Sequence, residues 1–408
     1  MNSVSKGLNF YFSSFRGFRT EVWILAAVTF VNRAGSMVIP FLSLYLTASQ
    51  GLSFQQVGWI MSSFGAGSVF GSWLGGRLTD QIGFYRVMVA TLFLSGLAFI
   101  GLQWIDGFGP FCIAIFCLTV LTDAFRPAMF VAVRHYASAE NRTRAVTLIR
   151  LAINLGFSMG PAIGGLIISR WSYAGLFWVD GISCIGAVCL MIASLKPISA
   201  EDLPQTEVGE ISRRPTSDAP FILAMLASLF VAIPFLQYFS TMPIYYRDEF
   251  GLDEFTIGLV LGLNGLLIFL LEMPLIKGCE DRGISLFSIL RFSSLLIGAS
   301  FAVLLIYPHV AFVWLGMTLL TVGEMLNFPF LNRFVYDRAD KGKPGAYMAG
   351  FTITWSVAHI VGHSAGLNSI EYFGFNQTWM ICGGMILIAI VLLSLAERRL
   401  TRELNCQH

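Results

Sequence analysis

The amino-acid sequence predicts an all-α polytopic membrane protein, with twelve transmembrane helices in two pseudo-symmetric bundles of six. Three observations support this fold class. The first is composition: 56% of the 408 residues are hydrophobic and only 12% are charged, about half the charged fraction of a soluble domain. The second is a series of apolar segments of membrane-spanning length. The third is the distribution of Lys and Arg between the loops that join these segments.

Twelve apolar segments are long enough to cross a bilayer. They cover residues 20–46, 54–77, 84–105, 108–136, 142–169, 173–195, 218–246, 254–277, 284–306, 308–337, 344–370 and 374–397. The long polar stretch between the sixth and seventh segments contains three prolines and is typical of a linker. We therefore expect an amphipathic N-terminal segment at 1–19, a six-helix bundle at 20–195, a linker at 196–217, a second bundle at 218–397 and a tail at 398–408.

Basic residues are concentrated in alternate loops. On one side of the membrane they are Lys6, Arg16, Arg19, Arg77, Arg86, Arg134, Arg142, Arg144, Lys196, Arg213, Arg214, Lys277, Arg282, Arg333, Arg338, Lys341, Lys343, Arg398, Arg399 and Arg402. The other side holds only Arg170 and Arg247. Because cytoplasmic loops carry an excess of Lys and Arg, both termini are predicted to be cytoplasmic. The short loops favour the inner (plasma) membrane of a bacterium. The net charge of +2 gives no reason to expect a nucleic-acid partner.

The first segment places a charge near the middle of the membrane. Arg33 follows Asn32 well inside the apolar stretch, where a charge costs at least ~2.5 kcal/mol on insertion scales. Both residues are therefore expected to face the interior of the protein, with an acidic partner for Arg33.

The second segment ends in the sequence GGRLTDQIGFYR. Gly76, Asp80, Gly83 and Arg86 stand at fixed intervals in it. The carboxylate of Asp80 could accept hydrogen bonds from the N-terminus of a neighbouring helix, which would hold the cytoplasmic side shut.

The fourth segment carries Asp123 and Arg126, which are three residues apart and so share one face of a helix. Two interpretations are open. The two side chains either neutralise each other within the helix, or line a cavity and pair with Arg33 or with a substrate.

The fifth segment contains RLAINLGFSMGPAIGG, from Arg150 to its last glycine. Its glycines at i, i+4 and i+8 lie on one helix face, and a proline bends the same turn. These residues are Gly156, Gly160, Pro161, Gly164 and Gly165. A face without side chains either serves ordinary close packing in lipid or forms part of a conformational motif.

The second half of the chain repeats the first weakly. At an offset of 200, Tyr45 matches Tyr245 and Gly51 matches Gly251, and at 202 Pro127 matches Pro329. Such a parallel repeat is expected for a transporter built from two related halves.

Two acids lie within apolar segments of the second half. Glu324 is in the middle of the tenth segment, with Asn327 three residues on, and Glu272 is in the inner third of the eighth. Loss of hydration disfavours the charged carboxylate, so such a group can take up and release a proton near neutral pH. The alternative is a permanently protonated structural acid.

Other polar residues carry weaker signals. Gln237, Tyr238 and Asn264 could line a pore. His359 and His363 have the i, i+4 spacing of metal ligands, but no acidic or thiol partner is close in the sequence, so packing or hydrogen bonding is favoured. The seven cysteines have no metal-binding or disulfide spacing. Nucleotide-binding and catalytic motifs are absent from the sequence. We therefore expect no enzyme activity, no metal and no cofactor.

Two of these motifs together resemble a known family. The Gly76–Arg86 pattern is similar to the loop signature of the major facilitator superfamily, and the glycine–proline helix resembles the antiporter signature of its twelve-helix drug:proton antiporters. Phe84 and Tyr85 stand where basic residues are usual. The resemblance implies alternating access driven by a proton gradient.

On this resemblance we expect a proton-coupled antiporter that exports drug-like or lipophilic small molecules as a monomer. Glu324, with Asp123 or Glu272, would carry the proton, and Arg33, Arg126 and Arg150 would hold these acids in a buried network. The polar residues expected to complete the substrate cavity are Asn32, Gln237, Tyr238, Asn264 and Asn327. The three arginines at cavity depth also favour an alternative, proton-coupled uptake of a peptide, sugar or organic acid. A lipid or lysolipid flippase is a third hypothesis. A receptor or scaffold without transport is less favoured, because buried charges would then lack a purpose.

Overall fold

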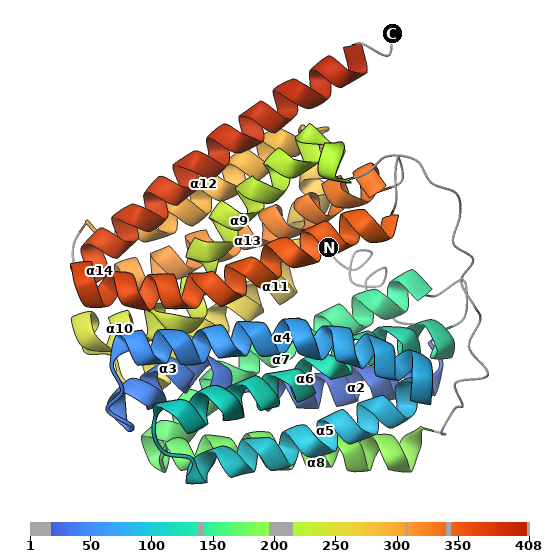
Figure 1. Ribbon diagram of the computed structural model, residues 1–408, viewed down its shortest axis with the longest axis vertical. Helices are drawn as coiled ribbons and strands as arrows, with labels where there is room; N and C mark the ends of the chain where they lie inside the picture. The colour runs from blue at the N-terminus through green and yellow to red at the C-terminus, as the bar shows by residue number, and fades with distance from the viewer. Residues whose placement is uncertain (1–17, 138–141, 196–214, 307–308, 340–343, 406–408) are drawn as a thin grey trace, which may run out of the picture.

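The computed structural model describes all residues except 1–17, 138–141, 196–214, 307–308, 340–343 and 406–408 (Figure 1). Regular structure in the described residues is entirely helical. The N-terminal segment that we predict at 1–19 and the linker at 196–217 lie almost wholly outside the described residues. Their ends, and the exact bounds of the two halves, stay predictions.

In the described residues of the first half, seven α-helices account for six membrane crossings. They are α2 (Thr20–Ala34), α3 (Val38–Ala48), α4 (Phe54–Ile82), α5 (Phe84–Gly101), α6 (Phe108–Tyr136), α7 (Arg142–Arg170) and α8 (Tyr173–Ser194). The first crossing is divided between α2 and α3. Both carboxylate oxygens of Asp180 in α8 accept hydrogen bonds there, from the N–H groups of Met37 at 2.9 Å and Val38 at 2.8 Å. Asp180 thus satisfies backbone groups that the break in the helix leaves free.

The second half repeats this arrangement. Its helices are α9 (Ala219–Ser240), α10 (Met242–Phe250), α11 (Glu254–Asp281), α12 (Leu286–Leu304), α13 (Val310–Ala339) and α14 (Pro344–Asn405). The seventh crossing is divided between α9 and α10, as the first is between α2 and α3. Helix α14 contains two crossings, joined at Gly374, where φ is +81°. Glycine adopts such a left-handed conformation without strain.

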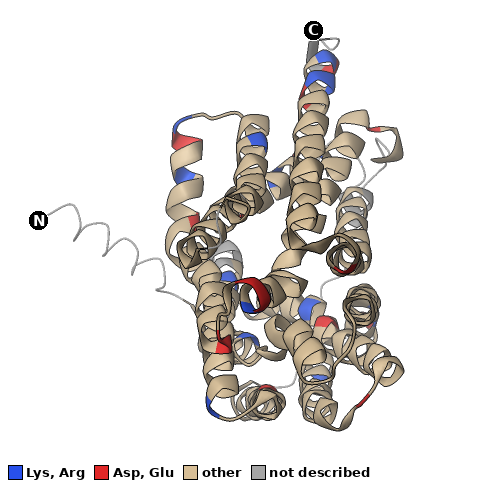
Figure 2. Cartoon of the chain, turned by 90° about the vertical axis from the view of Figure 1, so that its left-hand side faces the viewer, with Lys and Arg blue, Asp and Glu red and all other residues tan. Residues whose placement is uncertain are grey.

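Ten stretches of the described residues are long and apolar enough to span a membrane. One of these, Gly350–Glu403, is 54 residues long and covers the last two crossings of α14. Helix α4 is not among the ten because glycines and polar residues lower its hydropathy. With α4 included and α14 divided, the structure has the twelve crossings predicted from the sequence. Figure 2 shows that most of the helical ribbon carries neither basic nor acidic residues.

Within the first half, a row of glycines packs α4 against α6. Gly67, Gly71 and Gly75 follow one another at i, i+4 and i+8 and lie against the backbone of Phe116, Val120 and Ala124. A Cβ atom on Gly71 would lie 2.8 Å from the Cα of Val120. The sequence analysis did not single out this row, although its spacing is the same as that of the glycines in α7.

The two halves meet mainly along two pairs of helices, α4 with α14 and α7 with α11, and α3 also contacts α9 and α10. Ser62 in α4 donates a hydrogen bond to the carbonyl of Ile360 at 2.6 Å, and Glu371 accepts one from the N–H of Gln55 at 2.6 Å. These contacts lie toward the end of the bundle that carries the Gly374 turn. In Figure 1 the halves approach each other at this end, on the left, and diverge on the right, at the end where α7 begins and α13 ends.

Candidate functional site

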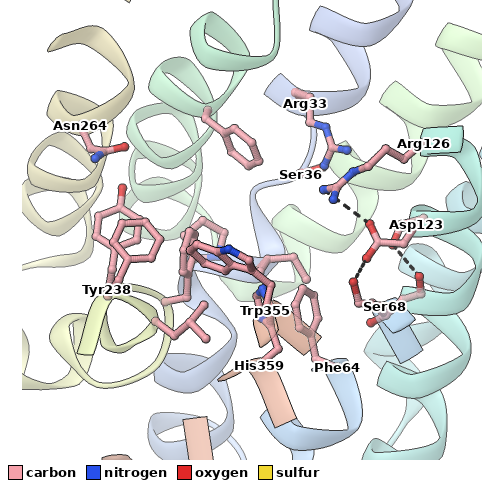
Figure 3. A pocket seen from close by; sticks show the side chains of 18 of the residues that line it. Arg33, Ser36, Phe64, Ser68, Asp123, Arg126, Tyr238, Asn264, Trp355 and His359 are labelled. Carbon is pink, nitrogen blue, oxygen red and sulfur yellow. Dashed lines mark hydrogen bonds and ion pairs between the residues drawn. The ribbon is translucent and has the colours of Figure 1, made fainter. Parts of the chain in front are cut away.

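A cavity of about 600 Å³ lies between the two halves. Residues of both halves line it, including charged residues of α2 and α6 on one side and polar residues of α11 and α13 on the other. Figure 3 shows Asn264 across the cavity from Arg33, Asp123 and Arg126.

The first half contributes a charged cluster to the wall. Asp123 accepts a hydrogen bond from the hydroxyl of Ser68, and its other oxygen lies 3.9 Å from Nη2 of Arg126. The side chain of Arg126 is 54% exposed, against 11% for Asp123. The two residues lie next to each other within α6, as the first interpretation expects, and both also line the cavity, as the second expects. Ser68 is a partner that the sequence did not reveal.

Arg33 also lines the cavity, but without the acidic partner that we expected. Its guanidinium lies over the ring of Phe157, 5.5 Å from the ring centroid, and it forms no ion pair with any acid in the described part of the chain. Asp123, which we expected as its partner, interacts instead with Ser68 and Arg126. A cation–π contact is a favourable alternative for a desolvated guanidinium.

The second half places a carboxyl group in the opposite wall. Oε2 of Glu324 accepts a hydrogen bond from Nδ2 of Asn264 at 2.7 Å, and the same nitrogen lies 3.1 Å from Oγ1 of Thr321. Tyr238 lies beside them and donates its hydroxyl proton to the carbonyl of Leu261 at 2.8 Å. No Lys or Arg among the described residues pairs with Glu324. Glu324 is therefore a half-buried acid whose hydrogen-bond partner is neutral.

The third predicted acid is arranged differently. Oε1 of Glu272 in α11 lies 3.0 Å from Nη2 of Arg150 in α7, so the pair connects the two halves. Neither residue belongs to the cavity wall. The side chain of Arg150 is 48% exposed, and a pair of this kind contributes little to stability.

Three polar residues that we expected in the cavity lie between packed helices instead. Asn32 donates to Sγ of Cys184 at 3.6 Å, and Gln237 donates to the carbonyl of Gly362 at 2.9 Å. Asn327 donates to the hydroxyl of Ser293 at 2.9 Å. These amides join α2 to α8, α9 to α14 and α13 to α12, respectively, and none of them lines the cavity.

The glycine motif of α7 packs on two sides. Gly156 and Gly164 lie against α2 and the start of α3, and a Cβ atom on Gly156 would lie 2.6 Å from the Cβ of Arg33. Gly160 is close to Ala34, while Gly165 faces α11, at the backbone of Glu254. Pro161 lines the cavity. The motif therefore packs α7 against α2 of its own half and against α11 of the other half.

The loop motif after α4 is positioned at the diverging end. Gly83 ends α4 with φ of +85°. Asp80 and Arg86 are exposed, and a Cβ atom on Gly76 would meet no atom within 4 Å. Asp80 has no ion-pair partner among the described side chains, and the first side chains of α7 lie outside that set. The proposed lock at Asp80 stays a prediction.

Aromatic rings make up much of the remaining wall. They are Phe64, Phe99, Phe157, Phe235, Tyr238, Phe239, Phe328, Phe351 and Trp355. The ring centroids of Phe328 and Trp355 are 4.9 Å apart, in an edge-to-face arrangement. Phenylalanine is so frequent in the chain that the sequence could not show which rings face the cavity.

Comparisons with known proteins agree with this architecture. Residues 22–363 match the Major Facilitator Superfamily. The chain is 22% identical over 391 residues to the "Uncharacterized MFS-type transporter YqjV" of Bacillus subtilis (strain 168), covering 93% of this chain and 94% of that protein. It is 23% identical over 369 residues to "Multidrug resistance protein 2" of the same organism, covering 85% and 88%.

Among solved structures, a POT family transporter in complex with 5-aminolevulinic acid aligns with a TM-score of 0.77 at 17% identity, covering 94% of this chain and 97% of that one. At this identity the similarity shows the fold alone. The fold class predicted from the sequence is confirmed.

Proposed function

The chain belongs to the Major Facilitator Superfamily, and on that premise we propose that it is a proton-coupled antiporter that exports drug-like or lipophilic small molecules. It works as a monomer by alternating access. The observation that carries the proposal is the carboxyl group of Glu324, which lies in the cavity wall with a neutral amide as its partner.

Glu324 is the acid best suited to carry the proton. Asp123 and Glu272 each lie next to an arginine, which stabilises the charged carboxylate. Glu324 has only Asn264 and the low-polarity wall around it, so its protonated and deprotonated forms are closer in free energy. Of the three acids named from the sequence, it alone can exchange a proton without breaking an ion pair.

Antiport follows if the proton and the substrate compete for this carboxylate. A lipophilic cation would bind among the aromatic rings with its charge toward deprotonated Glu324. Protonation from the opposite side of the membrane would remove that attraction and release the substrate. The curated relative "Multidrug resistance protein 2" supports an export role.

The diverging end of the bundle carries the described basic residues Arg77 and Arg86, near the end of α4, and Arg338, at the end of α13. On the distribution of Lys and Arg this end is cytoplasmic. The structure then corresponds to a state in which the cavity receives substrate from the cytoplasm, and the contacts near the Gly374 turn close the outer side. We propose that rocking of the halves about these contacts exchanges the two states.

A second function, proton-coupled uptake of a polar anionic solute, is favoured by one observation. Arg33 and Arg126 both line the cavity, and the side chain of Arg126 is more than half exposed. A peptide or organic acid could bind its carboxylate there. The direction of proton movement distinguishes the two functions.

The test uses purified protein in liposomes that enclose a pH-sensitive dye. When the vesicles are acid-loaded, a lipophilic cation such as tetraphenylphosphonium should cause proton efflux. Glu324→Gln should abolish this efflux and weaken cation binding, because the cation loses the opposite charge of the carboxylate. Glu249→Gln, at an exposed acid of α10 outside the cavity, is the matched control. Proton efflux that persists in Glu324→Gln refutes the assignment. Proton movement together with a dipeptide or organic acid establishes uptake instead.

A further inference from the structure

Three rings on α14 line the cavity with nitrogen atoms that the mechanism above does not use. Trp355, His359 and His363 follow one another at i, i+4 and i+8, so they share one face of the helix, and all three line the cavity. The ring centroids of Trp355 and His359 are 6.5 Å apart, and those of the two histidines 5.7 Å apart. Figure 3 shows Trp355 and His359 beside Phe64. We call these three residues the α14 row.

The nitrogen atoms of the α14 row lack partners. Nε1 of Trp355, Nδ1 of His359 and both ring nitrogens of His363 are buried without a hydrogen bond to any described residue. His363 is only 1% exposed. A buried polar group without a partner costs free energy, and native proteins contain few of them. Four such atoms on one helix face, beside a cavity, indicate a ligand that supplies their hydrogen bonds.

The surroundings of the row are apolar and flat. Phe64, from the other half of the protein, has its ring centroid 6.2 Å from that of His359 and 6.4 Å from that of His363. Phe328 packs against Trp355 on the other side. A ligand at the row would therefore contact rings as well as nitrogen atoms.

The chemistry of the row selects a neutral ligand. A neutral imidazole presents one N–H donor and one acceptor, and indole presents one donor. A hydroxyl group matches this set because it also donates one hydrogen bond and accepts others. A charged group would lose its hydration without an opposite charge in the row. The nearest charges that face His359 are Asp123 and Arg126, which lie 3.9 Å from each other and compensate mutually.

We propose that the α14 row is a substrate subsite that binds hydroxyl groups carried by a neutral apolar ring. This inference rests on the proposed function, because it takes the cavity to be the place where the transported molecule binds. The row also lies where the halves meet, since a Cβ atom on Gly65 of α4 would lie 2.8 Å from the carbonyl carbon of His359. A ligand whose hydroxyl group is bound there would contact residues of both halves.

Equilibrium binding to the purified protein in lipid nanodiscs, without a proton gradient, tests the proposal. Thiamphenicol and florfenicol are suitable probes because they are neutral and differ only in one hydroxyl group replaced by fluorine. Thiamphenicol should bind about fivefold more tightly, which is the effect of one net hydrogen bond. Equal affinities for the two probes, or no binding of either, overturn the proposal.

A substitution tests whether the preference for thiamphenicol over florfenicol arises at the α14 row. His363→Phe keeps an aromatic ring and removes the nitrogen atoms, so the ratio of the two affinities should fall to about one while florfenicol binding is unchanged. His309→Phe, at an exposed histidine in a loop, should keep the preference. A parallel loss of both probes in His363→Phe shows a structural role and refutes the subsite. If that variant does not assemble, His359→Phe provides the same comparison.

The two proposals fail in different experiments. Proton movement that depends on Glu324 but comes without any hydroxyl preference refutes the subsite and leaves the antiport intact. A hydroxyl preference that depends on the α14 row, with no effect of Glu324→Gln on proton movement, supports the subsite and refutes the coupling role of Glu324.

Discussion

Gly265 is a position at which the contact between the halves is sensitive to a single methyl group. A Cβ atom there would lie 2.5 Å from the backbone nitrogen of Ser158 and 2.8 Å from the carbonyl oxygen of Asn154, whereas ordinary van der Waals contact begins at 3.4 Å. Both neighbours are backbone atoms of α7, so no side chain can move aside. Gly265→Ala should therefore force α7 and α11 apart by about 1 Å.

The expected magnitude follows from the cost of overpacking, which is typically about 1–3 kcal/mol. Because about 1.4 kcal/mol corresponds to a factor of ten, the state with these helices in contact should lose about 5- to 150-fold in population. Alternating access supplies the competing state, in which the halves separate at the end near the Gly374 turn. Gly265→Ala should shift the protein toward that state.

Double electron–electron resonance measures this shift directly. Spin labels on Ser49→Cys and Tyr372→Cys, two exposed positions near the contacting end, report the distance between the halves. The labels are introduced after replacement of the seven native cysteines. Gly265→Ala should increase the population with the longer distance.

The matched control is Gly383→Ala, since a Cβ atom on Gly383 would meet no atom within 4 Å. It should leave the distance distribution unchanged. The reasoning is refuted if Gly265→Ala gives the same distribution as this control.

Two further predictions concern stability, measured by thermal unfolding in detergent with the exposed Asp281→Ala as control. Asp180→Ala removes the acceptor for two backbone N–H groups at the start of α3 and should lower the free energy of unfolding by about 1–3 kcal/mol. An unchanged melting temperature would show that these N–H groups need no side-chain acceptor at the break between α2 and α3. Nη2 of Arg338, a residue that is 4% exposed, lies 2.5 Å from Oδ2 of Asp218 and 3.3 Å from Oε2 of Glu403. Asp218→Ala removes the closer of these two acids and should lower the free energy of unfolding by about 3 kcal/mol. A melting temperature equal to that of the control would contradict the role of this buried pair.

Much of the architecture could be predicted from the sequence because it depends on local properties. The length and apolarity of a segment decide whether it can cross a bilayer, whatever its neighbours are. Eleven crossings follow from that rule directly, and α4 is the marginal case, because its glycines and polar residues lower its hydropathy. The glycine spacing in α7 likewise predicted a face of close approach, because i, i+4 and i+8 always share one side of a helix.

The identity of the cavity residues depended on tertiary structure. Asn264 and Asn327 are both amides within apolar helices, yet one holds Glu324 in the cavity wall and the other joins α13 to α12. The sequence does not distinguish them, because the rotation of each helix is fixed by packing with its neighbours. Sequence alone determined how many helices cross the membrane and which polar groups they carry. Only the packing of the two halves decided that Glu324 has a neutral partner and that the α14 row faces an open space.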